Sequence, residues 1–145
     1  MEVNKENIEF VKLKLREYGY YTKRIEECQR ELDDISSRIK DCYHVSGLRY
    51  DQPMNSSNPY FSRIHNILLE EGEVQTKKDN WQQKRNELNL DNLLSLLNAE
   101  SYELVKLHYF DNFSQGYIAV NKQYSTREKL TKKFKRIVTF LVKRY

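Results

Sequence analysis

Two apolar stripes with heptad spacing constrain the fold of this chain most. One stripe alternates spacings of three and four, as in a coiled-coil seam, and comprises Tyr18, Tyr21, Ile25, Cys28, Leu32, Ile35, Ile39 and Cys42. The other recurs every seven residues and comprises Tyr60, Ile67, Val74, Trp81 and Leu88. Charges of both signs lie between the seam positions, as expected of a solvated face. The stripes predict two long helices packed as an antiparallel hairpin, with the seam closed within one chain or across a dimer.

Glycine, proline and short polar runs indicate where these helices begin and end. Gly47, Pro53 and the polar run 55–58 predict a loop over residues 43–58, and Asn58 followed by Pro59 predicts the start of the second helix. A shorter helix is expected over residues 5–17. We expect a bend at Gly19, because glycine costs about 1 kcal/mol in a helix interior.

The composition agrees with an all-α protein. Of 145 residues, 32% are charged, four are Gly and two are Pro, which favours helices over strands. The sequence contains no run of about 18 apolar residues, the length that a membrane-spanning helix needs, and no apolar leader opens the chain. We therefore expect a cytoplasmic protein. Cys28 and Cys42 are expected to be reduced and buried.

No motif of an active site or cofactor site appears in the sequence. There is no glycine-rich phosphate loop or nucleophile elbow, and no His pairs with a Cys at a metal-ligand spacing. We therefore predict that the protein is not an enzyme and holds no metal or cofactor.

Positive charge is concentrated at the C-terminus. Residues 121–145 hold nine of the 25 Lys and Arg residues but one of the 21 acids, Glu128, which gives this stretch a net charge of +8. The rest of the chain has 16 basic and 20 acidic residues, a net charge of −4. Because such a helix repels itself, an anionic partner is expected, and DNA, RNA, an anionic membrane and an acidic protein are the candidates.

The order of elements in this region favours DNA. Residues 90–98 are apolar, a helix is expected over residues 100–110, and Ser114 is a suitable cap for a helix containing Ile118 and Ala119. Ser125 and Thr126 then precede a helix with an apolar stripe, Leu130, Phe134, Ile137, Val138 and Leu141. Two helices joined by a short turn, the second one basic, are typical of a helix-turn-helix. Its expected small core is Leu93, Leu97, Leu104, Leu107, Ile118, Leu130, Phe134 and Ile137.

The string LLNAESYELVKLHYFDNFSQGYIAVNKQYSTREKL is similar to region 4 of sigma-70-type factors. The aromatic pair Tyr109–Phe110, the Ile118–Ala119 helix and the Tyr124–Ser125 turn carry this resemblance. The whole layout resembles the small phage late-gene regulators of the RinA and ArpU kind. Lys122 and Gln123 depart from the pattern, which usually has Leu and Gly before the turn.

The resemblance implies a sequence-specific DNA-binding transcriptional regulator of a phage, prophage or mobile element. Residues 1–89 would form a hairpin and oligomerisation region, and residues 90–145 the helix-turn-helix domain. Double-stranded DNA, RNA polymerase and a second copy joined through the N-terminal helices are the expected partners. The predicted DNA contacts are Lys122, Ser125, Thr126, Arg127, Lys129, Lys132, Lys133 and Arg136.

Roles within this set follow from position. Thr126, Arg127 and Lys129, at the front of the helix, are expected at base edges, whereas Lys132, Lys133 and Arg136 are expected at phosphates. Two alternatives stay open. One is a protein–protein adaptor that uses the hairpin, and the other is a phage small terminase subunit.

Overall fold

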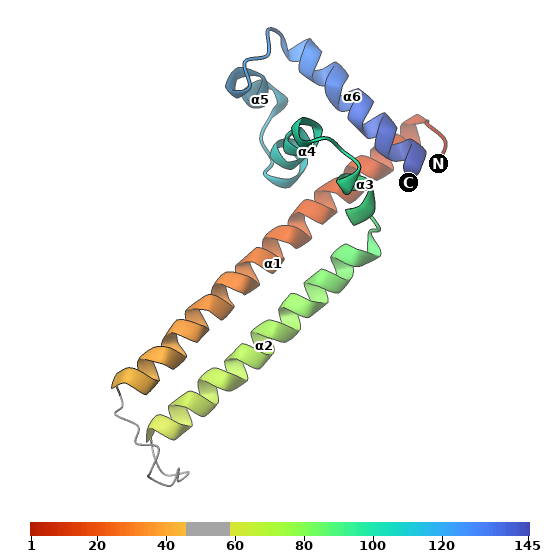
Figure 1. Cartoon of the computed structure of the whole chain (residues 1–145). Coiled ribbons are helices and arrows are strands. Elements are labelled where there is room, and N and C mark those ends of the chain that lie inside the picture. The colour runs from red at the N-terminus through yellow and green to blue at the C-terminus, as the bar shows by residue number, and fades with distance from the viewer. Residues whose placement is uncertain (46–58) are drawn as a thin grey trace. The chain divides into compact units, whose positions relative to one another are not determined.

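Every element that the structure describes is helical (Figure 1). The computed structural model describes residues 1–45 and 59–145. The elements are α1 (Lys5–Val45), α2 (Pro59–Glu87), α3 (Asp91–Ser95), α4 (Ala99–Val105), the π-helix η1 (Lys106–Phe110), α5 (Gln115–Asn121) and α6 (Arg127–Arg144). The all-α class is confirmed. Within these ranges, no helix is long and apolar enough to cross a membrane.

The ends of the long helices agree in part with the predicted ones. α2 begins at Pro59, as expected for a proline in the first helical position. α1 continues to Val45, so the first three residues of the predicted loop are helical. The rest of that loop, with Asn58, lies outside the described residues.

The described helices form two compact units. One unit comprises residues 1–23 together with 83–145, and the other comprises residues 24–82. The first turns of α1 explain why the start of the chain belongs to the first unit. Val11, Leu15 and Tyr18 are buried in one core with the C-terminal helices. These residues belong to the C-terminal unit because burying their apolar side chains there is favourable.

Within residues 24–82, the described parts of α1 and α2 form an antiparallel pair closed by the middle of the predicted stripes (Figure 1). Tyr18, Tyr21 and Leu88 of those stripes pack in the core of the other unit instead, and the side chain of Tyr60 lies outside the described residues. The core of residues 24–82 is Cys28, Ile35, Cys42, Ile64, Ile67 and Val74, with Leu32, Ile39 and Trp81 partly buried against it. Both cysteines are buried thiols that form no disulfide. At the surface Arg38 pairs with Glu70 at 2.9 Å, and Lys78 donates to Gln29 at 2.6 Å. The seam is therefore filled within one chain.

The other unit packs the short helices and α6 on the start of α1. Of the predicted C-terminal core, Leu97 and Leu107 are partly buried and the remaining six residues are buried. The Tyr18 hydroxyl donates a hydrogen bond of 2.6 Å to Asp91 at the start of α3. Burial, and then this bond, raises the pKa of Tyr18, so the phenol stays neutral.

The predicted bend at Gly19 is wrong, because α1 runs through this position without interruption. A Cβ added at Gly19 would lie 2.6 Å from the Cα and 2.8 Å from the Cδ1 of Phe110. Glycine is therefore needed for the close approach of η1 to α1, and not for a break in the helix.

Candidate functional site

The turn between α5 and α6 is held by capping bonds at both sides. The Ser114 hydroxyl accepts from the Tyr117 amide at 3.2 Å and caps the start of α5, as predicted. Thr126 caps α6 in the same way, accepting from the Lys129 amide at 3.4 Å. Each cap satisfies an amide that the first turn of a helix leaves free. The two helix ends that flank the turn are thus fixed by side chains.

The end of α5 has the hydrogen bonds of a Schellman motif. The Tyr124 amide donates to the Ala119 carbonyl at 2.9 Å, and the Gln123 amide donates to the Val120 carbonyl at 3.3 Å. Gln123 has a φ of 57°, in the left-handed region where glycine is usual. Although the sequence has Gln where the resembled pattern has Gly, the backbone adopts the conformation that glycine favours.

The next helix, α6, buries one face and exposes the other. All five residues of its predicted apolar stripe are buried, and Val142 is buried with them. Lys129, Lys132, Arg136 and Lys143 are exposed on the opposite side. Among the residues that the structure describes, no carboxylate forms an ion pair with any of these four side chains. Their charge is therefore left to solvent or to a partner.

Two of the predicted DNA contacts are instead paired with acids of α4. Lys122 forms an ion pair with Glu103 at 2.5 Å, and Lys133 forms one with Glu100. Glu100 also accepts a bond of 3.1 Å from the Tyr124 hydroxyl. This cluster ties α4 to the turn and to α6, so its lysines have a structural partner before any ligand binds.

The Glu100 cluster shifts the pKa values of its members. The bonds from Lys133 and then from Tyr124 hold the pKa of the Glu100 carboxyl below its usual value. The same bond to Glu100 raises the pKa of Lys133. Both groups are thus charged over a wider pH range than in a free side chain.

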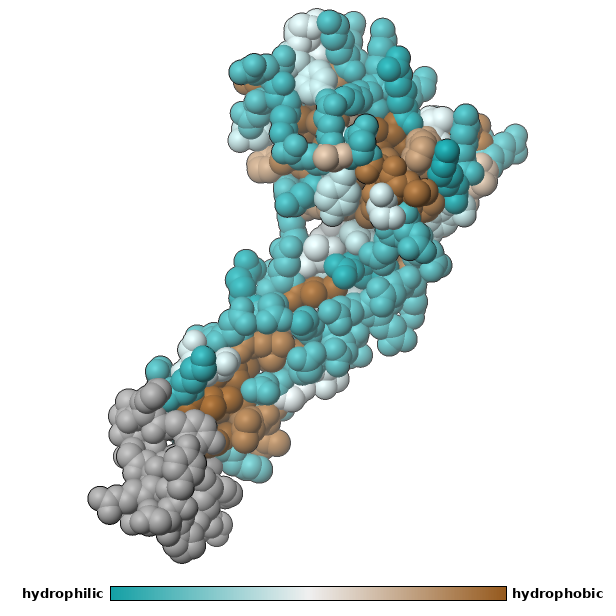
Figure 2. All heavy atoms as spheres, in the orientation of Figure 1, coloured by the Kyte–Doolittle hydropathy of each residue, from teal (hydrophilic) through white to brown (hydrophobic). Residues whose placement is uncertain are grey.

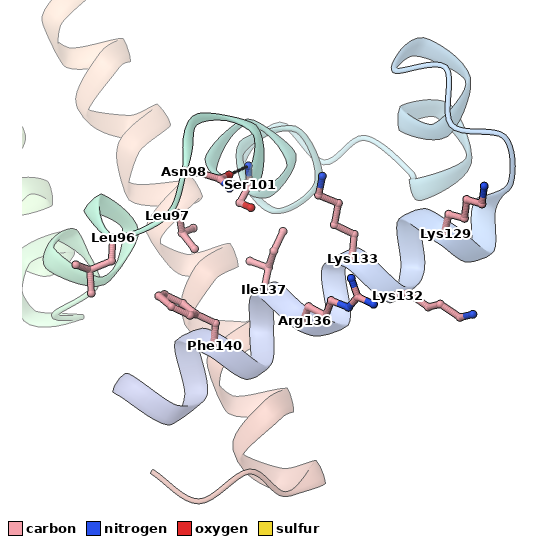
Figure 3. Close-up of a pocket in the computed structure, with 10 residues that line it drawn as sticks. All are labelled: Leu96, Leu97, Asn98, Ser101, Lys129, Lys132, Lys133, Arg136, Ile137 and Phe140. Atoms are coloured by element: carbon pink, nitrogen blue, oxygen red, sulfur yellow. Dashed lines mark hydrogen bonds between the residues drawn. The ribbon is translucent and has the colours of Figure 1, made fainter.

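A hollow of about 600 Å³ lies between α6 and the segment that joins α3 to α4 (Figure 3). Figure 3 shows Lys129 near the start of α6, and the side chain of Lys133 pointing toward α4 beside Ser101. Leu96, Leu97 and Phe140 lie toward the end of the hollow away from Lys129. A second hollow of about 430 Å³ follows α6 itself and is lined by Lys132, Lys135, Arg136, Thr139, Phe140, Lys143 and Arg144.

The predicted contact residues fall into three groups. Ser125, Thr126 and Arg127 are exposed where α6 begins. Lys129, Lys132 and Arg136 form a second exposed group along α6. The third group, Lys122 and Lys133, is bound in ion pairs to acidic residues of α4. Since two residues correspond to about 200° on a helix, Arg127 and Lys129 point to opposite sides of the first turn.

Other residues of this surface were not among the predicted contacts. Lys135 and Lys143 are exposed and belong to the same excess of charge, so the sequence already carried their signal. Gln115 accepts a bond of 2.8 Å from Thr131 and lines a hollow of about 510 Å³ with Arg127 and Lys132. That placement depends on the packing of α5 against α6, which residue spacing alone does not reveal.

Within residues 1–45 and 59–145, no group of three His, Cys, Asp or Glu side chains could hold a metal ion. No family model, curated protein or solved structure matches this chain. The surface of α6 and its capped turn are therefore the features of this chain that bear on its function.

Proposed function

We propose that α5, the capped turn and α6 form a helix-turn-helix that binds double-stranded DNA, with α6 in the major groove. The observation that carries this proposal is the exposed side of α6, where Lys129, Lys132, Arg136 and Lys143 have no acidic partner in the described chain. Cations along one exposed helix face can contact the phosphates and base edges of a groove that the helix enters. The resemblance to sigma region 4 adds the expectation of a transcriptional regulator of a phage or mobile element.

The arrangement of α6 modifies the roles expected from position alone. Lys129 lies in the first turn of the helix, where this motif places residues that read bases. Lys132, Arg136 and Lys143 continue the same face toward the C-terminus and would contact phosphates. Lys133 would chiefly hold α6 against α4 through Glu100, because its charge is already paired.

Fluorescence anisotropy with a labelled duplex of random sequence tests this proposal. Lys132→Ala and Arg136→Ala should each weaken binding and lower the slope of log affinity against log salt by about one unit. Lys77→Ala on α2 removes the same charge far from the proposed interface along the chain and serves as the matched control. Equal losses in all three variants would show that overall charge, and not this face, binds DNA.

Sequence preference is measured separately, by selection from a random duplex library. A preferred site should emerge from the selection. Lys129→Ala should lower the preference for that site over random DNA by about 1–3 kcal/mol if the lysine contacts a base edge. If the selection yields no preferred site, the protein binds DNA without sequence specificity, and the proposal of a sequence-specific regulator is wrong.

A second candidate function is an adaptor that binds an acidic segment of another protein. The hollow beside α6 supports this candidate, because Leu96 is 59% exposed there. Exposed apolar surface of this kind suits a protein partner better than it suits DNA. Leu96→Ser should weaken binding of an acidic protein and leave DNA affinity unchanged. Retention of an acidic partner with no DNA binding at low salt would favour this candidate.

A further inference from the structure

A third hollow lies between α6 and the start of α1. It has a volume of about 370 Å³ and lies inside the compact unit of residues 1–23 and 83–145. It opens on the flank of α6 opposite the hollow in Figure 3. None of the described residues that line it is an acid, and its basic side chains are Lys12, Arg16, His108 and Lys135. We call it the α1–α6 hollow.

Two of these cations have no acidic partner. Arg16 and Lys135 are exposed, and no ion pair within residues 1–45 and 59–145 includes either side chain. The Arg16 guanidinium lies 5.8 Å from the centre of the Tyr109 ring. This contact supports the planar group of Arg16 without using its N–H donors. Both cations are therefore available to a ligand.

The acids of the surrounding surface do not cancel this charge. Glu9 pairs with Lys12 at 3.3 Å, so these two side chains offset each other. Glu128 lines a neighbouring hollow, seven positions before Lys135 and about 10 Å away along the axis of α6. The charges of Arg16 and Lys135 are thus left uncompensated at the α1–α6 hollow.

Lys135 joins this hollow to the proposed DNA-binding face. It also lines the hollow that follows the exposed side of α6, together with Lys132 and Arg136. Being three positions after Lys132, it lies about 60° away around the helix. A helix about 10–12 Å in diameter fills a major groove about 12 Å wide, so the surface at its flank meets the phosphates of the groove wall. The α1–α6 hollow lies at such a flank.

The other flank of α6 is less suited to phosphate. Leu96 is 59% exposed there, and Lys133 is already paired with Glu100. Figure 2 shows apolar surface among hydrophilic residues in the part of the molecule where α3 and the end of α6 lie in Figure 1. The unpaired charge of α6 therefore continues toward α1 and not toward α3.

We propose that the α1–α6 hollow binds a backbone phosphate of the duplex that α6 enters, which makes the first helix of the chain part of the DNA interface. This inference rests on the proposed DNA binding and adds a contact from the other end of the sequence. Arg16 suits the role, because a guanidinium can donate two N–H groups to one phosphate. Lys135 neutralises the same phosphate or the next one. Such contacts fix the orientation of α6 in the groove without reading sequence.

Anisotropy with a labelled duplex of random sequence tests the contact. Arg16→Ala should weaken binding and make the slope of log affinity against log salt less negative by about 0.9, so the loss should shrink about three- to fourfold between about 50 and 200 mM salt. Arg16→Lys keeps the charge and should keep the wild-type slope, whereas a purely structural role of Arg16 would leave the slope unchanged in both variants.

The matched control is Arg30→Ala, the same change at an exposed position of α1 in the other compact unit, and it should leave the slope unchanged. Circular dichroism checks that each variant stays helical. Lys135→Ala should act as Arg16→Ala does, and the double variant should change the slope by nearly two units.

The outcomes separate this inference from the proposed function. If the wild type binds DNA but Arg16→Ala and Lys135→Ala keep its slope, the phosphate contact is wrong and DNA binding by α6 stands. A loss of slope in Arg30→Ala as large as in Arg16→Ala would also overturn the contact, because overall charge would then explain both. If the wild type does not bind the duplex at 50 mM salt, both proposals are wrong.

Discussion

Replacing Gly19 by Ala should destabilise the protein, although glycine in a helix interior is ordinarily unfavourable. Helix propensity alone predicts that Gly19→Ala stabilises α1 by about 1 kcal/mol. The structure predicts the opposite sign, because the new Cβ would lie 2.6 Å from the Phe110 Cα. The obstacle is backbone, so it cannot be relieved by a change of rotamer, and overpacking of this kind costs about 1–3 kcal/mol.

The expected net effect is a loss of about 1–2 kcal/mol in the free energy of unfolding, once the propensity gain is subtracted from the upper part of that cost. For a chain of this length, the melting temperature should fall by roughly 3–8 °C. Thermal unfolding followed by circular dichroism measures the change at low micromolar concentration. Gly72→Ala is the matched control, since nothing lies within 4 Å of its added Cβ. It should raise the melting temperature by a few degrees. A rise for Gly19→Ala as well would refute the close approach of η1 to α1.

Three further substitutions test single contacts. Gln123→Gly should raise the melting temperature by a few degrees, since about 1 kcal/mol of left-handed backbone strain is removed at a φ of 57°, whereas Gln123→Ala should give no gain. Tyr18→Phe should cost about 1 kcal/mol by removing the 2.6 Å bond to Asp91, and Tyr117→Phe, at an exposed position, should leave the unfolding temperature unchanged. Because the pKa of Glu100 is lowered in the fold, its stabilising effect is present above the unfolded pKa of about 4.3 and is lost as the pH falls through the lower folded value. The difference in melting temperature between the wild type and Glu100→Gln should therefore shrink between pH 7 and pH 3, and a constant difference would contradict the cluster.

Local patterns predicted the helices well. The heptad stripes, Pro59 and the caps at Ser114 and Thr126 depend on residues within a turn or two of each other, so spacing and side-chain type suffice to find them. The buried stripe of α6, centred on Phe134, could also be predicted from residue spacing, because one face of such a helix must pack against the core.

Contacts between residues far apart in the sequence could not be predicted from local patterns. Gly19 was interpreted through its helix propensity, but its role depends on Phe110, which lies far along the chain. The pairs Lys122–Glu103 and Lys133–Glu100 join residues 19 and 33 positions apart, and residue spacing does not encode such partners. Likewise, the apolar residues at the start of α1 indicated that this part of the helix is buried, but not which helices pack against it.

These contacts change the weight given to individual basic residues. Counting charge treats all nine cations of residues 121–145 alike, whereas the structure pairs Lys122 and Lys133 with acids and leaves the exposed face of α6 unpaired. The proposed interface is consequently narrower than the one predicted from charge alone. It centres on Lys129, Lys132 and Arg136.

The salt dependence of DNA binding by the wild-type chain tests the central claim most directly. Affinity for a labelled duplex would be measured by anisotropy at several salt concentrations between about 50 and 200 mM. The three cations of this face proposed to contact phosphates, Lys132, Arg136 and Lys143, predict by themselves that log affinity falls linearly with log salt with a slope of about −3, at about −0.9 for each phosphate neutralised. Absence of binding at 50 mM salt, or an affinity that does not change with salt, would contradict the proposal that this face of α6 binds DNA.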